Sequence, residues 1–143
     1  MKKVYLDICS FNRPFDDQTQ MKIRLETEAK LYVQACIRNK KYSLVWSYMH
    51  DLENNDNPYN ERRNPISLWK DIADEYCPAT DDILSAGQKI MSYGIRAKDA
   101  LHIACAIKSG CDCFITTDKG LLKKHIDNII IINPIDFVRE MEK

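Results

Sequence analysis

The chain is poor in the residues and patterns that mark disordered, membrane-spanning or secreted proteins. Only 4 Gly and 5 Pro occur in 143 residues, which argues against long disordered tracts. No segment approaches the roughly 18 to 20 consecutive apolar residues of a membrane-spanning helix, and the N-terminus becomes acidic too early for a signal peptide. We therefore expect a single domain over residues 1–143, cytoplasmic and without a membrane partner.

Signatures of disulfide frameworks and zinc sites are also missing. There is no CxxC pair and no paired His at zinc-ligand spacing. Cys111 and Cys113 form a CxC pair, for which packing at a strand edge is favoured over binding of a soft metal. Because the cysteines lie mainly in apolar surroundings, we expect reduced thiols without disulfides at all six positions, Cys9, Cys36, Cys77, Cys105, Cys111 and Cys113.

Net charge does not indicate a nucleic-acid partner, since 21 basic and 21 acidic side chains balance. Their distribution is uneven. Residues 19–42 carry six basic and two acidic side chains, whereas residues 49–82 carry nine acidic and three basic ones. A basic flank beside an acidic region is typical of metal-dependent enzymes that act on polyanions, because cations contact phosphates while metal offsets carboxylates. Solvated helix faces would produce the same pattern.

Short apolar runs alternate with amphipathic segments along the whole chain. We predict strands at 2–7, 42–46, 113–118 and 128–133, and helices at about 19–40, after Ser47, around 66–76, before Gly94 and Gly110, and from Pro134. Asp16 and Asp17 are the expected caps of the helix at 19–40. Strands separated by helices predict a three-layer α/β/α sandwich around a mostly parallel sheet of four to five strands.

Four acids occupy positions that this topology would bring together. Asp7 and Asp118 end strands, Asp99 begins a helix, and Glu53 lies about two turns into the helix after the second strand. Converging carboxylates repel one another unless a cation is bound, and an all-oxygen ligand set selects Mg²⁺ or Mn²⁺. Such a site supports hydrolysis of a phosphodiester by metal-activated water.

Each acid also has a purely structural interpretation. Asp7 would suit a turn, Asp99 and Asp118 would suit helix caps, and Glu53 would suit an exposed helix face. Singly these interpretations are favoured, but the joint placement favours a site. Asp51 competes with Glu53 and would lie on another face of the same helix.

Four segments carry a resemblance that spans nearly the whole chain: YLDICSFNRPFDD (5–17), SYMHDLE (47–53), KDALHIACA (98–106) and ITTDKGLL (115–122). In order and spacing they resemble the PIN domains, metal-dependent ribonucleases that include the toxins of VapC-type toxin–antitoxin pairs. The resemblance implies a PIN-like fold and cleavage of single-stranded RNA. It also implies that Asp7, Glu53, Asp99 and Asp118 are the catalytic and metal-binding residues. Ile8 departs from the family, where many relatives place a polar residue.

Polar neighbours would hold these carboxylates in place. Asn12, Thr117 and Ser10 are the expected hydrogen-bonding partners, although Thr116 and Thr117 suit a strand equally well. For His102 a role in the core or on the helix surface is favoured over contact with the site, since a metal-activated water needs no histidine base.

The remaining expectations concern partners. Arg13 and Lys119 are candidate contacts for RNA phosphates, together with Lys123 and Lys124. An antitoxin protein and a homodimer are further possible partners. The competing hypothesis is a PIN-like module that binds RNA or a protein without cutting. The RNA target and the number of metal ions stay open.

Overall fold

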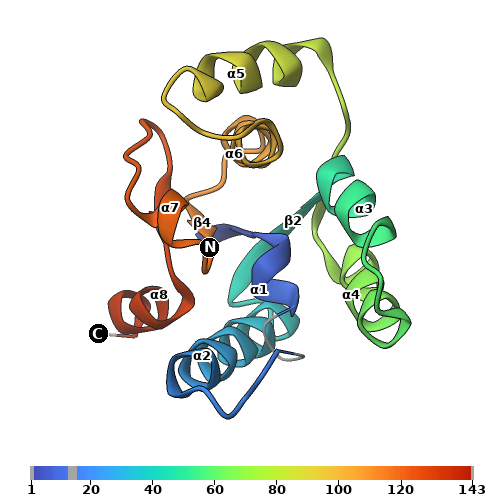
Figure 1. The fold of residues 1–143 in the computed structure, drawn as a ribbon, viewed down its shortest axis with the longest axis vertical. Helices are drawn as coiled ribbons and strands as arrows, with labels where there is room; N and C mark the ends of the chain where they lie inside the picture. The colour runs from blue at the N-terminus through green and yellow to red at the C-terminus, as the bar shows by residue number, and fades with distance from the viewer. Residues whose placement is uncertain (1, 13–15, 143) are drawn as a thin grey trace.

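The computed structural model describes residues 2–12 and 16–142, in which strands alternate with helices (Figure 1). The five strands are β1 (Lys2–Leu6), β2 (Tyr42–Ser47), β3 (Glu75–Cys77), β4 (Cys113–Ile115) and β5 (Ile130–Ile132). The helices are α1 (Ile8–Asn12), α2 (Met21–Arg38), α3 (Tyr48–Asn55), α4 (Asn60–Ile72), α5 (Asp81–Met91), α6 (Ala97–Lys108), α7 (Lys119–Leu122) and α8 (Pro134–Met141).

The strands form one sheet in the order β3-β2-β1-β4-β5, and its four pairings are all parallel. The central strand β1 pairs on both sides, so that Val4 lies opposite Leu44 and Cys113. A parallel sheet is covered on both faces, which explains why Val4, Tyr5 and Leu6 are all fully buried. The predicted parallel sheet of four to five strands is confirmed.

Alternate residues of the strands build two separate cores. Tyr5, Val45 and Phe114 face the layer of α5 and α6, while Leu6 and Trp46 face the layer of α2, α4 and α8. Figure 1 shows α5 and α6 on one side of the strands and α2 and α8 on the other. The predicted three-layer α/β/α sandwich is therefore confirmed.

Helix boundaries follow local signals at most positions. Ser47 caps α3 by accepting a hydrogen bond from the His50 amide, and Thr80 caps α5 in the same way from Ile83. Gly94, with φ +86°, and Gly110, with φ +74°, follow the ends of α5 and α6 in the left-handed region.

The start of α2 differs from the prediction. Its N-cap is Gln20, without a side-chain capping bond. Asp17 instead accepts hydrogen bonds from the amide (3.0 Å) and hydroxyl (2.7 Å) of Thr19, which closes a turn before the helix. Asp16 pairs with Arg62 at 3.1 Å. The predicted capping role was wrong, because Asp17 bonds to Thr19 in the turn before the helix and Asp16 pairs with Arg62 of α4.

Strand β3 was missed by the sequence analysis, which continued the helix through it. Glu75 and Tyr76 are exposed, so the strand lacks an apolar run. Its extended conformation comes from pairing with Val45, Trp46 and Ser47 of β2. Such a strand is defined by its neighbour and not by its own propensity.

All six cysteines are free thiols, and all but Cys9 are buried. Within the described ranges, no helix has the length and apolar character needed to cross a bilayer.

Candidate functional site

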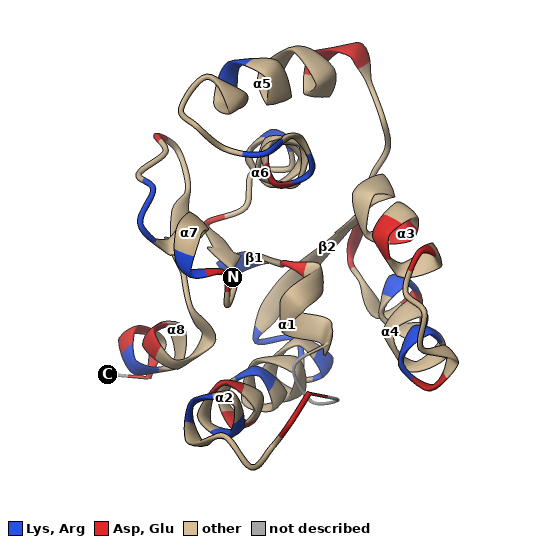
Figure 2. Cartoon of the chain, viewed as in Figure 1, with Lys and Arg blue, Asp and Glu red and all other residues tan. Residues whose placement is uncertain are grey.

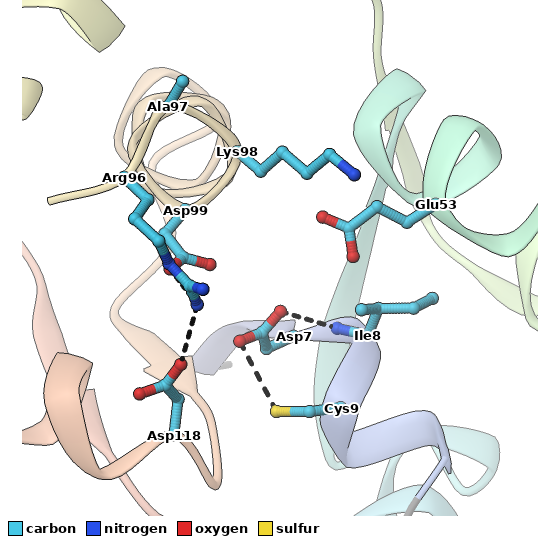
Figure 3. A pocket seen from close by; sticks show the side chains of 9 residues that line it. All are labelled: Asp7, Ile8, Cys9, Glu53, Arg96, Ala97, Lys98, Asp99 and Asp118. Atoms are coloured by element: carbon cyan, nitrogen blue, oxygen red, sulfur yellow. Dashed lines mark hydrogen bonds and ion pairs between the residues drawn. The ribbon is translucent and has the colours of Figure 1, made fainter. Parts of the chain in front are cut away.

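A pocket of about 390 Å³ lies beyond the carboxyl ends of β1 and β4, where α1, α3, α6 and α7 come together. It is lined by Asp7, Ile8, Cys9, Glu53, Arg96, Ala97, Lys98, Asp99 and Asp118. Figure 3 shows the carboxylates of the four predicted acids directed into this space from different elements. The fold thus brings together side chains that lie up to 111 positions apart, from 7 to 118.

Asp7 is the most firmly held of the four acids. It directly follows β1, is 5% exposed, and accepts hydrogen bonds from the Ile8 amide (2.7 Å), the Thr116 hydroxyl (2.8 Å) and the Cys9 thiol (3.5 Å). Burial raises the pKa of Asp7, and the negative charge of Glu53 adds to the rise, although His102 and the hydrogen bonds from Thr116 and Cys9 oppose it. Asp7 is thus an anchored carboxylate at the inner end of the pocket.

Asp99 and Asp118 share one cation. The Arg96 guanidinium lies 3.3 Å from Asp99 Oδ2 and 3.5 Å from Asp118 Oδ2. Burial raises the pKa of Asp99, the charge of Asp7 raises it further, and Arg96 opposes both. The Arg96 side chain is itself 81% exposed, so it reaches into the pocket from solvent.

Asp118 combines two roles that the sequence presented as alternatives. Its Oδ1 caps α7 by accepting hydrogen bonds from the amides of Gly120 (2.8 Å) and Leu121 (3.3 Å). Its Oδ2 faces Arg96 in the pocket. The capping bonds fix the carboxylate and leave one oxygen directed toward the site (Figure 3).

Glu53, and not Asp51, lines the pocket. Glu53 Oε1 lies 2.9 Å from Nε2 of His102. Asp51 lies outside the pocket lining, where it accepts hydrogen bonds from the Trp46 indole (2.9 Å), Lys70 (3.1 Å) and the Tyr76 hydroxyl (2.9 Å). His102 is fully buried, as predicted for a core residue, and in addition touches the site through Glu53.

The hydroxyl that supports Asp7 comes from Thr116. Thr117, named from the sequence, donates its backbone amide to the Cys9 sulfur at 3.4 Å. The Ser10 hydroxyl donates to the Ile115 carbonyl at 3.3 Å, and the Asn12 amide donates to the Ile8 carbonyl at 3.3 Å. In these contacts Ser10, Asn12 and Thr117 support backbone or sulfur atoms near the site and not its carboxylates.

Lys119 and Arg13 were the first two candidates for contact with RNA phosphates. Lys119 begins α7 next to Asp118 and is exposed, but is not among the residues that line the pocket. Arg13 lies outside the described residues.

Three lining residues with polar or charged side chains were not predicted as part of the site: Cys9, Arg96 and Lys98. Arg96 and Lys98 precede Asp99 by three residues and one residue, so their signal was proximity to a predicted acid in the first turn of α6. Figure 3 shows Lys98 extending across the pocket toward Glu53. Burial, followed by the charge of Asp7, raises the pKa of Cys9 to about 12, which keeps it a neutral thiol beside the carboxylate.

The charge pattern around the pocket differs from the expected basic flank. Figure 2 shows acidic positions at the end of β1, on α3 and on α6, while α2 carries charges of both signs. The cations that line the pocket, Arg96 and Lys98, belong to the start of α6 and not to residues 19–42. A polyanion in this pocket would therefore meet the α6 cations first.

The donor set of the pocket fits a hard divalent cation. Its four carboxylates offer oxygen ligands. Burial raises the pKa of Asp7 and of Asp99, and neighbouring carboxylates add to the rise, Glu53 for Asp7 and Asp7 for Asp99, so a bound cation would relieve these negative charges. Among the described residues, no three His, Cys, Asp or Glu side chains are close enough to hold an ion by themselves. Mg²⁺ commonly binds through one or two carboxylates and several waters, which an open pocket of this size accommodates.

Fold and pocket together define an α/β protein with a carboxylate-lined site at the carboxyl ends of parallel strands. The family model of the PIN domain matches residues 16–126, more than half of the chain. The chain therefore belongs to the PIN domain family, whose members are generally nucleases. Because the match begins after Asp7, the placement of that residue in the site rests on the geometry.

Solved structures give the same fold. A chain from the crystal structure of VapBC2 from Rickettsia felis, bound to a DNA fragment from their promoter, superimposes with a TM-score of 0.56. The likeness covers 92% of this chain and 98% of that one at 12% sequence identity, so it concerns the fold alone. No curated protein matches the sequence.

Proposed function

We propose that the protein is a Mg²⁺- or Mn²⁺-dependent endoribonuclease that hydrolyses phosphodiester bonds of single-stranded RNA. The observation that carries this proposal is the convergence of Asp7, Glu53, Asp99 and Asp118, from four different elements, on one pocket. Membership of the PIN domain family supports nuclease chemistry in this pocket.

One or two of the four carboxylates, together with several water molecules, would hold the metal. When bound, a divalent ion lowers the pKa of a water molecule and stabilises negative charge on the phosphoryl oxygens. Asp7 supplies a carboxylate whose orientation is fixed by Ile8, Cys9 and Thr116. Asp118 offers one oxygen because its other oxygen caps α7. No side-chain nucleophile is required.

Cations at the mouth of the pocket would bind the substrate. Arg96 and Lys98 line the pocket, and Lys119 lies beside Asp118 at the start of α7. Their charges would contact phosphates on either side of the scissile bond, so RNA affinity should fall as salt rises. Arg96 would exchange its contacts with Asp99 and Asp118 for phosphate oxygens.

Cleavage assays with conservative variants test the proposal. Asp7→Asn, Glu53→Gln and Asp118→Asn remove ligand charge with little change in shape, and should each lower Mn²⁺-dependent cleavage of a single-stranded RNA by roughly 100-fold or more, since metal ligation contributes several kcal/mol. Asp51→Asn is the matched control, because Asp51 is two residues from Glu53 but lies outside the pocket. Cleavage that survives EDTA and the Asp7 substitution would refute the proposal.

A role as the toxin of a toxin–antitoxin pair is the biological form of this proposal. Its support is the fold shared with a chain of VapBC2, in which two proteins are solved together. An antitoxin would then close the carboxylate-lined pocket. Growth arrest on expression, relieved by the product of a neighbouring gene and absent in Asp7→Asn, is the expected outcome. If Asp7→Asn arrests growth equally, toxicity does not arise from this pocket.

The competing proposal is a PIN-like module that binds RNA or a protein without cutting. The contact of Arg96 with two of the four acids favours it, since a resident cation can replace a metal ion. Binding of Mn²⁺ or RNA without any turnover would support this second function. A homodimer is a further proposal, tested by sedimentation.

A further inference from the structure

A chain of buried polar groups runs from the interior to the rim of the pocket. The Tyr5 hydroxyl lies 2.6 Å from Ser47 Oγ and 2.5 Å from His102 Nδ1, and His102 Nε2 lies 2.9 Å from Glu53 Oε1. Tyr5, Ser47 and His102 are all fully buried and come from β1, β2 and α6. This series of hydrogen bonds is continuous and enclosed, and it ends at Glu53, one of the proposed metal ligands.

The partners of each group set the direction of the hydrogen bonds. The Ser47 amide donates to His50 Nδ1 at 2.9 Å, and His50 Nε2 therefore donates to the Leu6 carbonyl at 2.6 Å. The Ser47 hydroxyl also lies 3.2 Å from His50 Nδ1, but that nitrogen already accepts from the Ser47 amide, which leaves Tyr5 as the acceptor for the hydroxyl. The Tyr5 hydroxyl then donates to His102 Nδ1, and His102 Nε2–H donates to the Glu53 carboxylate. Both ring nitrogens of His102 are thus engaged by hydrogen-bonding partners, so the imidazole is held in one orientation.

Glu53 depends on this chain of hydrogen bonds more than Asp7 and Asp118 depend on any one neighbour. Asp7 is held by local donors, and Asp118 by the amides of α7. Glu53 has a longer side chain with more rotamers, and His102 is the partner observed for it. A carboxylate has about four lone-pair sites, so one hydrogen bond at Oε1 leaves capacity for a metal ion or water.

We propose that His102 is a positioning residue that orients Glu53 for divalent-metal binding, and that Tyr5 and Ser47 hold His102 in the required orientation. The proposal rests on the proposed function only in that the pocket must bind a divalent ion. It assigns His102 no contact with RNA and no part in proton transfer. The enclosed Tyr5–His102 pair would act through Glu53 alone.

Two substitutions at His102 separate positioning from packing. His102→Gln places an amide nitrogen near the position of Nε2 and keeps a donor toward Glu53. His102→Asn places its amide near Nδ1, within reach of Tyr5, and loses that donor. Ile103→Val is the control, because Ile103 is the next residue of α6, is equally buried and does not belong to the polar chain.

The decisive measurement is Mn²⁺ binding to the RNA-free protein by titration calorimetry, with thermal unfolding recorded for each variant. Loss of a hydrogen bond to a metal ligand typically weakens metal binding about 10- to 100-fold, which we expect for His102→Asn. His102→Gln should stay within about threefold of the wild type, as should Ile103→Val. In cleavage assays His102→Asn should lower kcat at saturating RNA with little change in KM for RNA.

The outcomes distinguish the possible failures. If the wild type binds no Mn²⁺, the proposed function and this inference both fail. If His102→Asn is folded and binds Mn²⁺ like the wild type, only the positioning role is overturned. The role would also be overturned if His102→Asn and His102→Gln lost Mn²⁺ affinity equally and in proportion to their fall in melting temperature. If His102→Asn does not fold, Tyr5→Phe is the deciding variant. Weaker Mn²⁺ binding by Tyr5→Phe would support the positioning of Glu53 through His102, and unchanged binding would refute it.

Discussion

Lys30 is buried where its charge is costly, and its replacement by methionine should stabilise the protein. The residue lies on α2 and is 2% exposed, with its ammonium 5.2 Å from the centre of the Phe11 ring. Burial, with a smaller effect from the charge of Arg38, lowers the pKa of Lys30 from 10.5 to about 7. Methionine keeps the length and apolar stem of lysine and removes the charge.

The magnitude follows from the pKa. Each unit of difference between the folded and unfolded states is worth about 1.36 kcal/mol, so lowering the pKa from 10.5 to about 7 disfavours folding by on the order of 4 kcal/mol at neutral pH. Loss of the cation–π contact with Phe11 offsets roughly 1 kcal/mol. We expect Lys30→Met to raise the free energy of unfolding by about 2 to 4 kcal/mol at pH 7.

The pH dependence has a defined sign. Between about pH 7 and pH 10.5 the unfolded chain binds more protons at Lys30 than the folded one, so this group makes the wild type more stable as pH rises. Urea unfolding of both proteins at several pH values from 6.5 to 10 is the assay, since other titrating groups cancel in the difference. The advantage of Lys30→Met should shrink steadily across this range.

Lys22 provides a matched control on the same helix, because it is exposed. Lys22→Met should change the free energy of unfolding by less than about 0.5 kcal/mol at every pH. Destabilisation by Lys30→Met at pH 7, or an advantage that is constant with pH, would show that Lys30 is not buried as a costly charge.

Two further predictions concern the pocket. Arg96→Gln removes the cation shared by Asp99 and Asp118, so Mn²⁺ should bind roughly twofold to tenfold more tightly in calorimetry, while RNA affinity falls. Weaker Mn²⁺ binding by this variant would contradict competition between Arg96 and the metal ion. Thr116→Val preserves shape but removes the hydroxyl bound to Asp7 Oδ2, and should lower metal-dependent cleavage about 10- to 100-fold. Thr117→Val is its control, since Thr117 contacts Cys9 through its backbone, and equal losses in the two variants would contradict this assignment.

Much of the site could be anticipated from the sequence, because strand ends in a parallel sheet lie on one edge. That rule predicts that Asp7 and Asp118 lie together, helix spacing puts Glu53 and Asp51 on different faces, and the resemblance to PIN domains favours Glu53. The sequence could not favour Thr116 over Thr117 as the hydrogen-bonding partner of Asp7. Adjacent residues after a short strand differ only in the direction in which their side chains point. It also could not reveal the pairing of Glu53 with His102, which joins residues 49 positions apart.

The three layers, the mostly parallel sheet and the expected grouping of the acids followed from the sequence itself, through periodicity and the positions of caps and turns. Strand β3, the cation shared by Asp99 and Asp118, and the buried path from Ser47 to Glu53 were decided only by the tertiary structure. The physical reason is that periodicity records which face of an element is buried. Which polar atoms then meet depends on side-chain directions at contacts between elements that are distant along the chain.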